Sequence, residues 1–199
     1  RARRDRWSSR PTCLPFPRTA RRNDGGPATL ARSNVVSKQD ILDVLYDIPD
    51  PELPVSIVDL GLVKTVEVVA CRTQIELLPT WTGCPALDVI ERDVVRRIQE
   101  LDGVDECVVK WSFDPPWSPD RISDAGRSRL EAHGITTTSC HTNVSNLVQL
   151  GTSIIPCPYC ESRNTRLDST FGPTRCRSIY FCEDCRNQFE HMKPTADDQ

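Results

Sequence analysis

The sequence contains no run of about 18 apolar residues, the length that a membrane-spanning helix requires. This absence predicts a protein with no membrane partner. The sequence also shows no apolar signal segment, so its ten cysteines are expected in a reducing cytoplasm and not in a secreted disulfide scaffold. Four cysteines without metal-ligand spacing are accordingly expected to be free thiols: Cys13, Cys71, Cys107 and Cys140.

Methionine is nearly absent, because the sequence contains only Met192. The first residue of the sequence is Arg1. The first 32 residues carry nine arginines against Asp5 and Asp24, a charge of +7 in a chain of net charge −3. Because they are rich in proline and glycine and lack an apolar period, residues 1–36 are predicted to be disordered. We expect an over-extended reading frame or a processed piece; a nucleic-acid-binding arm and an organelle transit sequence are the alternatives.

Histidine is scarce as well, with three in the chain and none between residues 37 and 132. A cysteine hydrolase needs a base beside its nucleophile, and no histidine is available there. His133 follows a short helix expected at residues 123–132, and His141 lies in a polar stretch where it should be exposed. The scarcity of histidine therefore argues against a cysteine–histidine hydrolase.

The segment from residue 37 to 113 alternates between helical and strand patterns. Ser37 and Asp40 form a helix N-terminus, and the proline-rich stretch at residues 49–54 must end that helix. The expected elements are a helix from residue 37 to 48, strands at 62–69 and 73–78, a helix from 84 to 103 and a strand at 105–113. This α-β-β-α-β order predicts an α+β sandwich with helices on one sheet face.

Cys84 precedes Pro85 at the start of the second expected helix, where proline is preferred. We predict that Cys84 is the N-cap of this helix, where the partial positive charge of the helix end lowers a thiol pKa. Gly83 allows the tight approach of the backbone. The alternative, an ordinary buried cysteine, is weighted equally on the local sequence.

Three carboxylates, Asp50, Glu52 and Asp59, lie in the loop between the first helix and the first strand. They could lie near Cys84 and complete a mixed sulfur and oxygen metal site. Loop carboxylates are more often only solvated, so this alternative stays open.

The C-terminal segment contains two Cys-x-x-Cys hooks, Cys157/Cys160 and Cys182/Cys185, separated by 21 residues. Four thiolates delivered in two tight turns suit tetrahedral Zn²⁺, which predicts a zinc ribbon over residues 154–193. A rubredoxin-like iron site and a chance clustering of cysteines are the alternatives. Two further candidates could serve as supporting or substitute ligands: Cys176 and His191.

Several motifs resemble known families. The sequences 50-DPELP-54, 59-DLG-61 and 80-TWTGCP-85 are similar to the SufT-like domain of iron–sulfur cluster assembly proteins. Further along, 115-PPWSPD-120, 157-CPYC-160, 171-FGPTRC-176, 180-YFCEDC-185 and 189-FEHMK-193 resemble the PaaD subunit of the bacterial phenylacetyl-CoA epoxidase system. The resemblance covers roughly residues 37–193 and implies an α+β SufT-like domain at 37–135, a linker at 136–153, a zinc ribbon at 154–193 and a tail at 194–199.

This resemblance implies a maturation factor that assembles or delivers an iron–sulfur cluster, or iron, to the monooxygenase of aerobic phenylacetate degradation. By similarity Cys84 is the transient ligand, the pocket is formed by Asp50, Glu52, Asp59, Thr80 and Gly83, and zinc is structural. Its expected partners are the oxygenase or reductase subunits of the epoxidase. A homodimer and a purely structural adaptor role remain open.

Two further expectations follow from the ribbon sequence. Glycine is common after the second cysteine of a zinc knuckle, where φ is positive, but Glu161 and Arg186 occupy these positions and predict some strain. A nucleic-acid-binding ribbon is the weaker alternative, because basic and acidic residues nearly balance over residues 154–193 and a phosphate-binding surface needs a basic face.

Overall fold

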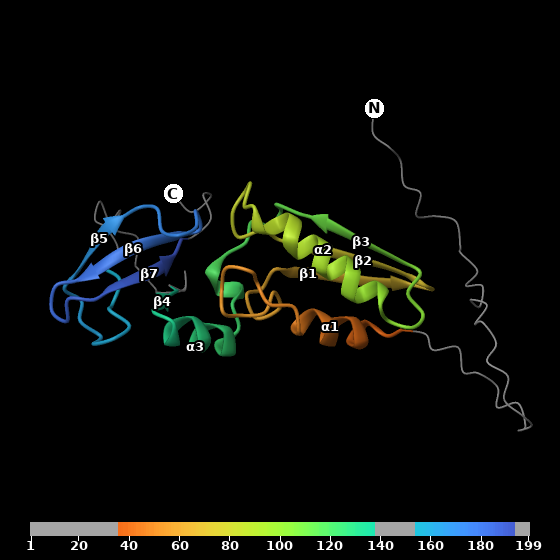
Figure 1. Cartoon of the computed structure of the whole chain (residues 1–199), viewed down its shortest axis with the longest axis horizontal. Helices are drawn as coiled ribbons and strands as arrows, with labels where there is room; N and C mark the ends of the chain where they lie inside the picture. Colours follow the sequence, from red (N-terminus) through yellow and green to blue (C-terminus); the bar gives the residue numbers. More distant parts are fainter. Residues whose placement is uncertain (1–35, 138–153, 194–199) are drawn as a thin grey trace, which may run out of the picture.

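The structure, a computed structural model, describes residues 36–137 and 154–193. Most of the predicted arm and linker, the whole tail, Cys13, Cys140 and His141 lie outside the described residues. The described part forms two modules side by side, an α/β module (residues 36–132) and a ribbon (residues 154–193), with α3 and β4 beside the ribbon (Figure 1).

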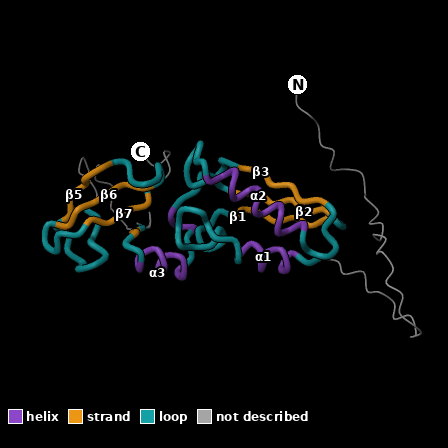
Figure 2. Tube along the Cα trace, viewed as in Figure 1, coloured by secondary structure: helices purple, strands orange, loops and turns teal. Residues whose placement is uncertain are grey.

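The α/β module confirms the predicted α+β class and the α-β-β-α-β order. Its three-stranded sheet has the order β1-β2-β3, with β1 and β2 antiparallel and β2 and β3 parallel. Figure 2 shows both helices on the same face of this sheet. The elements are α1 (Lys38–Tyr46), β1 (Val63–Val69), β2 (Arg72–Leu77), α2 (Ala86–Gln99) and β3 (Glu106–Trp111).

Local sequence explains where the first elements begin and end. The Ser37 hydroxyl accepts from the Asp40 N–H at 3.2 Å, and the Asp40 carboxylate accepts from the Ser37 N–H at 2.8 Å. This capping box satisfies donors that the first helical turn leaves unpaired. The β1–β2 hairpin turns at Ala70, whose φ is 54°.

The core of the α/β module lies between the two helices and the sheet. Burial alternates along β2, where Thr73, Ile75 and Leu77 are buried and the residues between them are partly exposed. This alternation is the expected pattern for a sheet with one covered face. The helices contribute the fully buried side chains of Ile41, Leu45, Val94 and Ile98.

A second sheet, with the order β4-β7-β6-β5, forms the ribbon. Its first strand, β4 (Ile135–Thr136), directly follows α3 (Asp124–Ala132) and pairs in parallel with β7. Thr136, at the start of the predicted linker, is therefore part of a sheet. The other strands are β5 (Thr165–Ser169), β6 (Arg177–Cys182) and β7 (Gln188–Met192).

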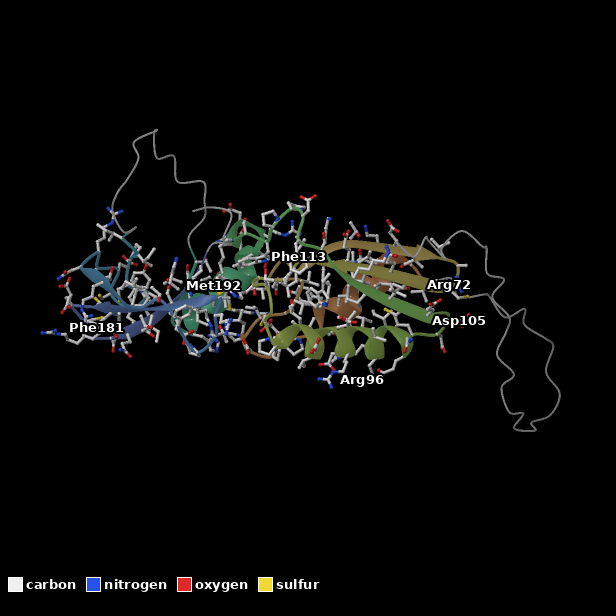
Figure 3. All side chains as sticks on the ribbon, turned by 90° about the horizontal axis from the view of Figure 1, so that it is seen from above. Arg72, Arg96, Asp105, Phe113, Phe181 and Met192 are labelled. Atoms are coloured by element: carbon white, nitrogen blue, oxygen red, sulfur yellow. The ribbon has the colours of Figure 1, made fainter. Side chains whose placement is uncertain are left out.

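One hydrophobic cluster extends from the α/β module into the ribbon, and the ribbon has a second, smaller cluster of its own around Phe189. Met192, at the end of β7, is fully buried and belongs to the same cluster as the core residues of the α/β module, together with Ile135. Figure 3 shows Met192 at the end of the ribbon nearest the α/β module and Phe181 at its far end. The ribbon is thus packed against the module and does not hang from it by a linker alone.

One expectation about the remaining cysteines is wrong. Cys71 is disulfide-bonded, whereas Cys107 is a free, buried thiol, as expected. Cys71 lies in the turn between β1 and β2 and is partly exposed. Among the described residues, no helix combines the length and the apolar character that crossing a bilayer demands.

Candidate functional site

The four hook cysteines meet at the end of the ribbon that lies far from the α/β module. Their sulfur atoms all lie within 4.8 Å of one another. The Cys157–Cys185 and Cys160–Cys182 sulfur pairs are each 3.6 Å apart. A tetrahedron with Zn–S bonds of about 2.3 Å has edges of about 3.8 Å, so the sulfur spacing fits a tetrahedral ion. The four cysteines therefore form a group that could hold a metal ion.

Backbone donors support the sulfur atoms. Cys157 accepts hydrogen bonds from the Tyr159 and Cys160 N–H groups, and Cys185 accepts one from Asn187. Cys160 accepts one from Ser162, and the Ser162 and Asn187 donors each follow a left-handed residue, Glu161 at φ 59° and Arg186 at φ 63°. Glu161 and Arg186 thus adopt the positive φ predicted for these positions although neither is glycine. The hydrogen bonds to sulfur form as they would with glycine there.

Cys176 and His191 lie at the opposite end of the ribbon. Cys176 precedes β6 and Cys182 ends it, so six residues of extended chain, about 20 Å, separate Cys176 from the metal cluster. His191 is buried in β7, and its Nδ1 lies 2.9 Å from the Thr136 hydroxyl of β4. Neither residue belongs to the four-cysteine cluster.

Cys84 lies in the loop that precedes α2 and is half-buried. The prediction that it is the N-cap is wrong, because Pro85 occupies that position with helical backbone angles, φ −65° and ψ −20°. The Cys84 sulfur nevertheless accepts a hydrogen bond from the Ala86 N–H, in the first turn of α2. Gly83 precedes it at φ 75°, a left-handed conformation that glycine adopts without strain.

The electrostatic surroundings of Cys84 also differ from the prediction. Burial raises the pKa of the Cys84 thiol, and the negative charges of Glu52, Cys176 and Asp50 raise it further, while the Ala86 N–H acts in the opposite direction. The sequence showed the helix end but not the buried, anionic surroundings. These surroundings outweigh the helix end and keep the resting sulfur a thiol.

Two of the three predicted carboxylates lie near Cys84. Burial raises the pKa of Asp50, although its carboxylate accepts from the Glu52 and Leu53 N–H groups at 2.8 and 3.0 Å. Glu52 is exposed, and Thr80, at the start of the Cys84 loop, is buried. The structure thus brings Asp50 and Glu52 into the electrostatic surroundings of this cysteine.

The third carboxylate, Asp59, joins the loop to α3. It is 3% exposed, accepts from the Ser123 hydroxyl at 2.6 Å, and lies 3.5 Å from an Arg129 guanidinium nitrogen. Its backbone oxygen accepts from the Ser123 N–H at 2.9 Å. These contacts indicate a residue that holds α3 in place.

Sequence patterns gave no indication that ribbon residues approach the Cys84 loop. The Lys193 ammonium lies 5.4 Å from the centre of the Trp81 ring and 4.5 Å from that of Phe171. The Cys84 N–H donates to the Trp81 carbonyl at 3.4 Å. The only available signal was the motif 189-FEHMK-193, which carries no distance information by itself.

The α/β module with the Cys84 loop and the ribbon with the four-cysteine cluster together define a class of protein. In this class an iron–sulfur assembly domain is joined to a zinc ribbon. Residues 38–111 match the family described as iron–sulfur cluster assembly protein. Residues 141–193 match the PaaD zinc beta ribbon domain. The resemblance to SufT-like and PaaD sequences is thereby confirmed.

The chain belongs to the PaaD family of phenylacetyl-CoA epoxidase subunits. It is 35% identical over 170 residues to an Escherichia coli (strain K12) protein, the putative D subunit of 1,2-phenylacetyl-CoA epoxidase. The match covers 83% of this chain and 96% of that protein.

Shorter relatives match about half of the chain. The Fe-S protein maturation auxiliary factor of Porphyromonas gingivalis is 34% identical, over 47% of this chain and 90% of that protein. A solved structure of a domain of unknown function from Bacillus anthracis is 33% identical, with a TM-score of 0.44, over 46% of this chain and 89% of that one.

Proposed function

We propose that this protein is a non-catalytic maturation factor that assembles or delivers an iron–sulfur cluster, or iron, to a multicomponent phenylacetyl-CoA epoxidase. Its partners would be the oxygenase or reductase subunits of that enzyme. Membership of the PaaD family and similarity to Fe-S maturation auxiliary factors support this role.

The observation that carries the proposal is the setting of Cys84. Its sulfur lies in a loop, half-buried, next to the charges of Asp50 and Glu52. A half-buried sulfur can be reached by a partner that hands over or accepts an ion, whereas a fully buried one cannot. We propose Cys84 as the transient ligand, with Asp50, Glu52, Thr80 and Gly83 forming the pocket around it.

The raised pKa of Cys84 suits a temporary ligand. Binding the cargo requires the thiol to lose its proton to solvent, and release of the cargo allows the thiolate to take a proton back. Because burial and neighbouring charges disfavour the empty thiolate, the sulfur does not remain in a reactive anionic form between transfers.

We further propose that the resident metal of the ribbon is structural zinc, held by Cys157, Cys160, Cys182 and Cys185. Metal analysis of the purified protein should give about one zinc per chain, and Cys182→Ser should abolish it. Iron at the same stoichiometry would instead identify a rubredoxin-like site.

The delivery role is tested by comparing cofactor loading of the epoxidase matured with wild type, Cys84→Ser and Cys107→Ser. Cys107 is the matched control, because it is a second free thiol of the α/β module and is buried. We expect loading to fall sharply with Cys84→Ser and to persist with Cys107→Ser. Full loading by Cys84→Ser would leave the structural adaptor as the function.

A further inference from the structure

β3 forms one edge of the three-stranded sheet, whose order is β1-β2-β3. Figure 1 shows it along the border of the α/β module, beside α2. Its six residues pair with β2 in an unbroken register from Glu106 to Trp111. An edge strand presents unpaired N–H and C=O groups to which a further strand can bond. The free side of β3 is therefore a place where a strand can be added.

The backbone groups of alternate β3 residues point away from β2. The Ser112 N–H, directly after the strand, donates to the Leu77 carbonyl at 2.8 Å, so every second residue counted back from Ser112 also faces β2. The residues between them, Cys107, Val109 and Trp111, direct their N–H and C=O groups outward. Within the described residues, no backbone contact outside the β2–β3 ladder uses these groups.

The other sheet edges carry features that hinder pairing. β1 has a register shift between Val63 and Thr65, and the Arg121 guanidinium donates to the Val63 carbonyl at 3.1 Å. β5 has a register shift between Leu167 and Ser169, and β4 is only two residues long. Bulges, short strands and covering side chains are common means of blocking edge pairing. Among the described strands, β3 is the one edge longer than two residues with a regular register.

The open face of β3 carries one acid and one base. Cys107 is buried on the helix-covered face, so Glu106, Val108 and Lys110 lie on the opposite face. Glu106 and Lys110 are both exposed, and Lys110 has no ion pair with any described residue. Glu106 is paired with Arg72 of β2 at 2.8 Å, but a carboxylate has a second oxygen that can accept from another donor.

Symmetry leaves few ways to pair two copies of this edge. In an antiparallel pair the outward-directed residues must face one another, so a two-fold axis can pass through Cys107, Val108 or Val109. The Val108 axis places Glu106 of each copy opposite Lys110 of the other, with the two Val108 side chains between these pairs. The Val109 axis places Lys110 opposite valine, and the Cys107 axis does the same to Glu106. Opposite charges in facing positions stabilise a sheet, which favours the Val108 axis.

We propose that β3 is the interface of a homodimer, in which two copies pair antiparallel about Val108 and join their sheets. Cys107 of each copy exchanges backbone hydrogen bonds with Val109 of the other, and Glu106 binds Lys110 of the other copy at both ends. One short strand from each copy buries less surface than the roughly 1,600 Å² of a standard interface. The dimer should therefore be weak and concentration-dependent. This inference does not depend on the delivery role of Cys84.

The test is sedimentation equilibrium of the full, zinc-loaded chain over a range of concentrations. Wild type should show a monomer–dimer equilibrium. Glu106→Lys and Lys110→Glu each place like charges opposite one another at both ends of the interface, so each should dimerise about tenfold more weakly or worse. An equimolar mixture of these two variants should recover the association of the wild type, because glutamate faces lysine at both ends of the mixed dimer. Recovery also shows that both variants are folded.

A charge reversal at the opposite edge of the same sheet is the matched control. Glu67 is an exposed acid of β1, and Glu67→Lys should dimerise as wild type does. A wild type that stays monomeric, or single β3 variants that associate as wild type does, would overturn the proposal. A mixture that associates no better than its two components would do the same.

Amide hydrogen exchange locates the interface in the wild-type protein. The Cys107 and Val109 N–H groups should exchange rapidly in dilute protein and about tenfold more slowly when the dimer forms. The Val108 N–H, which faces β2, should be protected at every concentration. Rapid exchange of Val109 within the dimer would mean that another surface associates. Equal protection of Val109 in the dilute monomer would mean that another segment of the same chain, such as residues 1–35, covers this edge, and would refute the proposed interface.

Discussion

At the scale of single residues, the metal hooks show how backbone geometry can override residue preference. Glu161 and Arg186 adopt positive φ, because only this turn directs N–H groups toward sulfur. The left-handed conformation costs a residue with a Cβ about 1–2 kcal/mol. Binding of the proposed metal would offset this strain, which explains how the chain tolerates two non-glycine residues where glycine would fit better.

Glu161→Gly should therefore stabilise the metal-bound protein. The relieved strain exceeds the extra conformational freedom that glycine adds to the unfolded chain, for a gain of about 0.5–1 kcal/mol. Denaturant unfolding of the zinc-loaded protein measures the gain. Glu161→Ala is the control, because it keeps the Cβ and should show no gain; an equal gain with alanine would mean that the glutamate side chain, and not the backbone, was responsible.

Cys84 shows what a local pattern can and cannot predict about one residue. The motif around Gly83 and Pro85 correctly indicated a helix directly after Cys84, because those effects act over two or three residues, but the N-cap is Pro85 and not Cys84. Its pKa depends on burial and on the charges of Glu52, Cys176 and Asp50, which are distant in sequence. The predicted direction of the pKa shift was wrong for this reason.

At the scale of elements, β7 connects the metal ribbon to the rest of the molecule. It pairs with β6 on one side and with β4 on the other, so it lies in the interior of the four-stranded sheet. His191 is buried in this strand beside Thr136 of β4, and burial lowers its pKa to about 4. The imidazole is therefore neutral in the folded protein.

This burial predicts a loss of stability in acid. The folded pKa lies below the ordinary value of 6.5, so protonation favours the unfolded chain, and the contribution of His191 is lost as pH falls from about 6.5 toward 4. Denaturant unfolding at several pH values should show a steeper decline for wild type than for His191→Asn. Protonation of the metal-binding thiolates affects both proteins, so equal slopes would contradict a role for His191.

At the scale of the whole molecule, the ribbon and the α/β module are packed as one unit. Met192 of β7 lies in the core of the α/β module, and β4 extends from α3 into the sheet of the ribbon. Asp59, which was predicted to line the pocket, holds α3 through Ser123 and so helps to fix this arrangement. A change that destabilises one module should therefore also destabilise the other.

Removing the metal should weaken the α/β module as well as the ribbon. After chelation, amide hydrogen exchange in β1, β2 and β3 should become faster, because the ribbon no longer holds Met192 in the core. Met192→Ala should destabilise the metal-bound protein by about 2–5 kcal/mol and make exchange in the α/β module less sensitive to chelation. Exchange in these strands that does not respond to chelation in the wild type would show that the modules are independent.

Local sequence was enough to predict the order of the elements in the α/β module and the grouping of the four hook cysteines, while the family was indicated by the resemblance of longer motifs. These features depend on periodicity, capping and short spacings, which act over a few residues. Only the packed chain sets the position of Cys176, the approach of Lys193 to Trp81, the role of Asp59 and the protonation of Cys84. Each of these depends on which distant residues pack together and on how far packing excludes water, and no local spacing encodes that information.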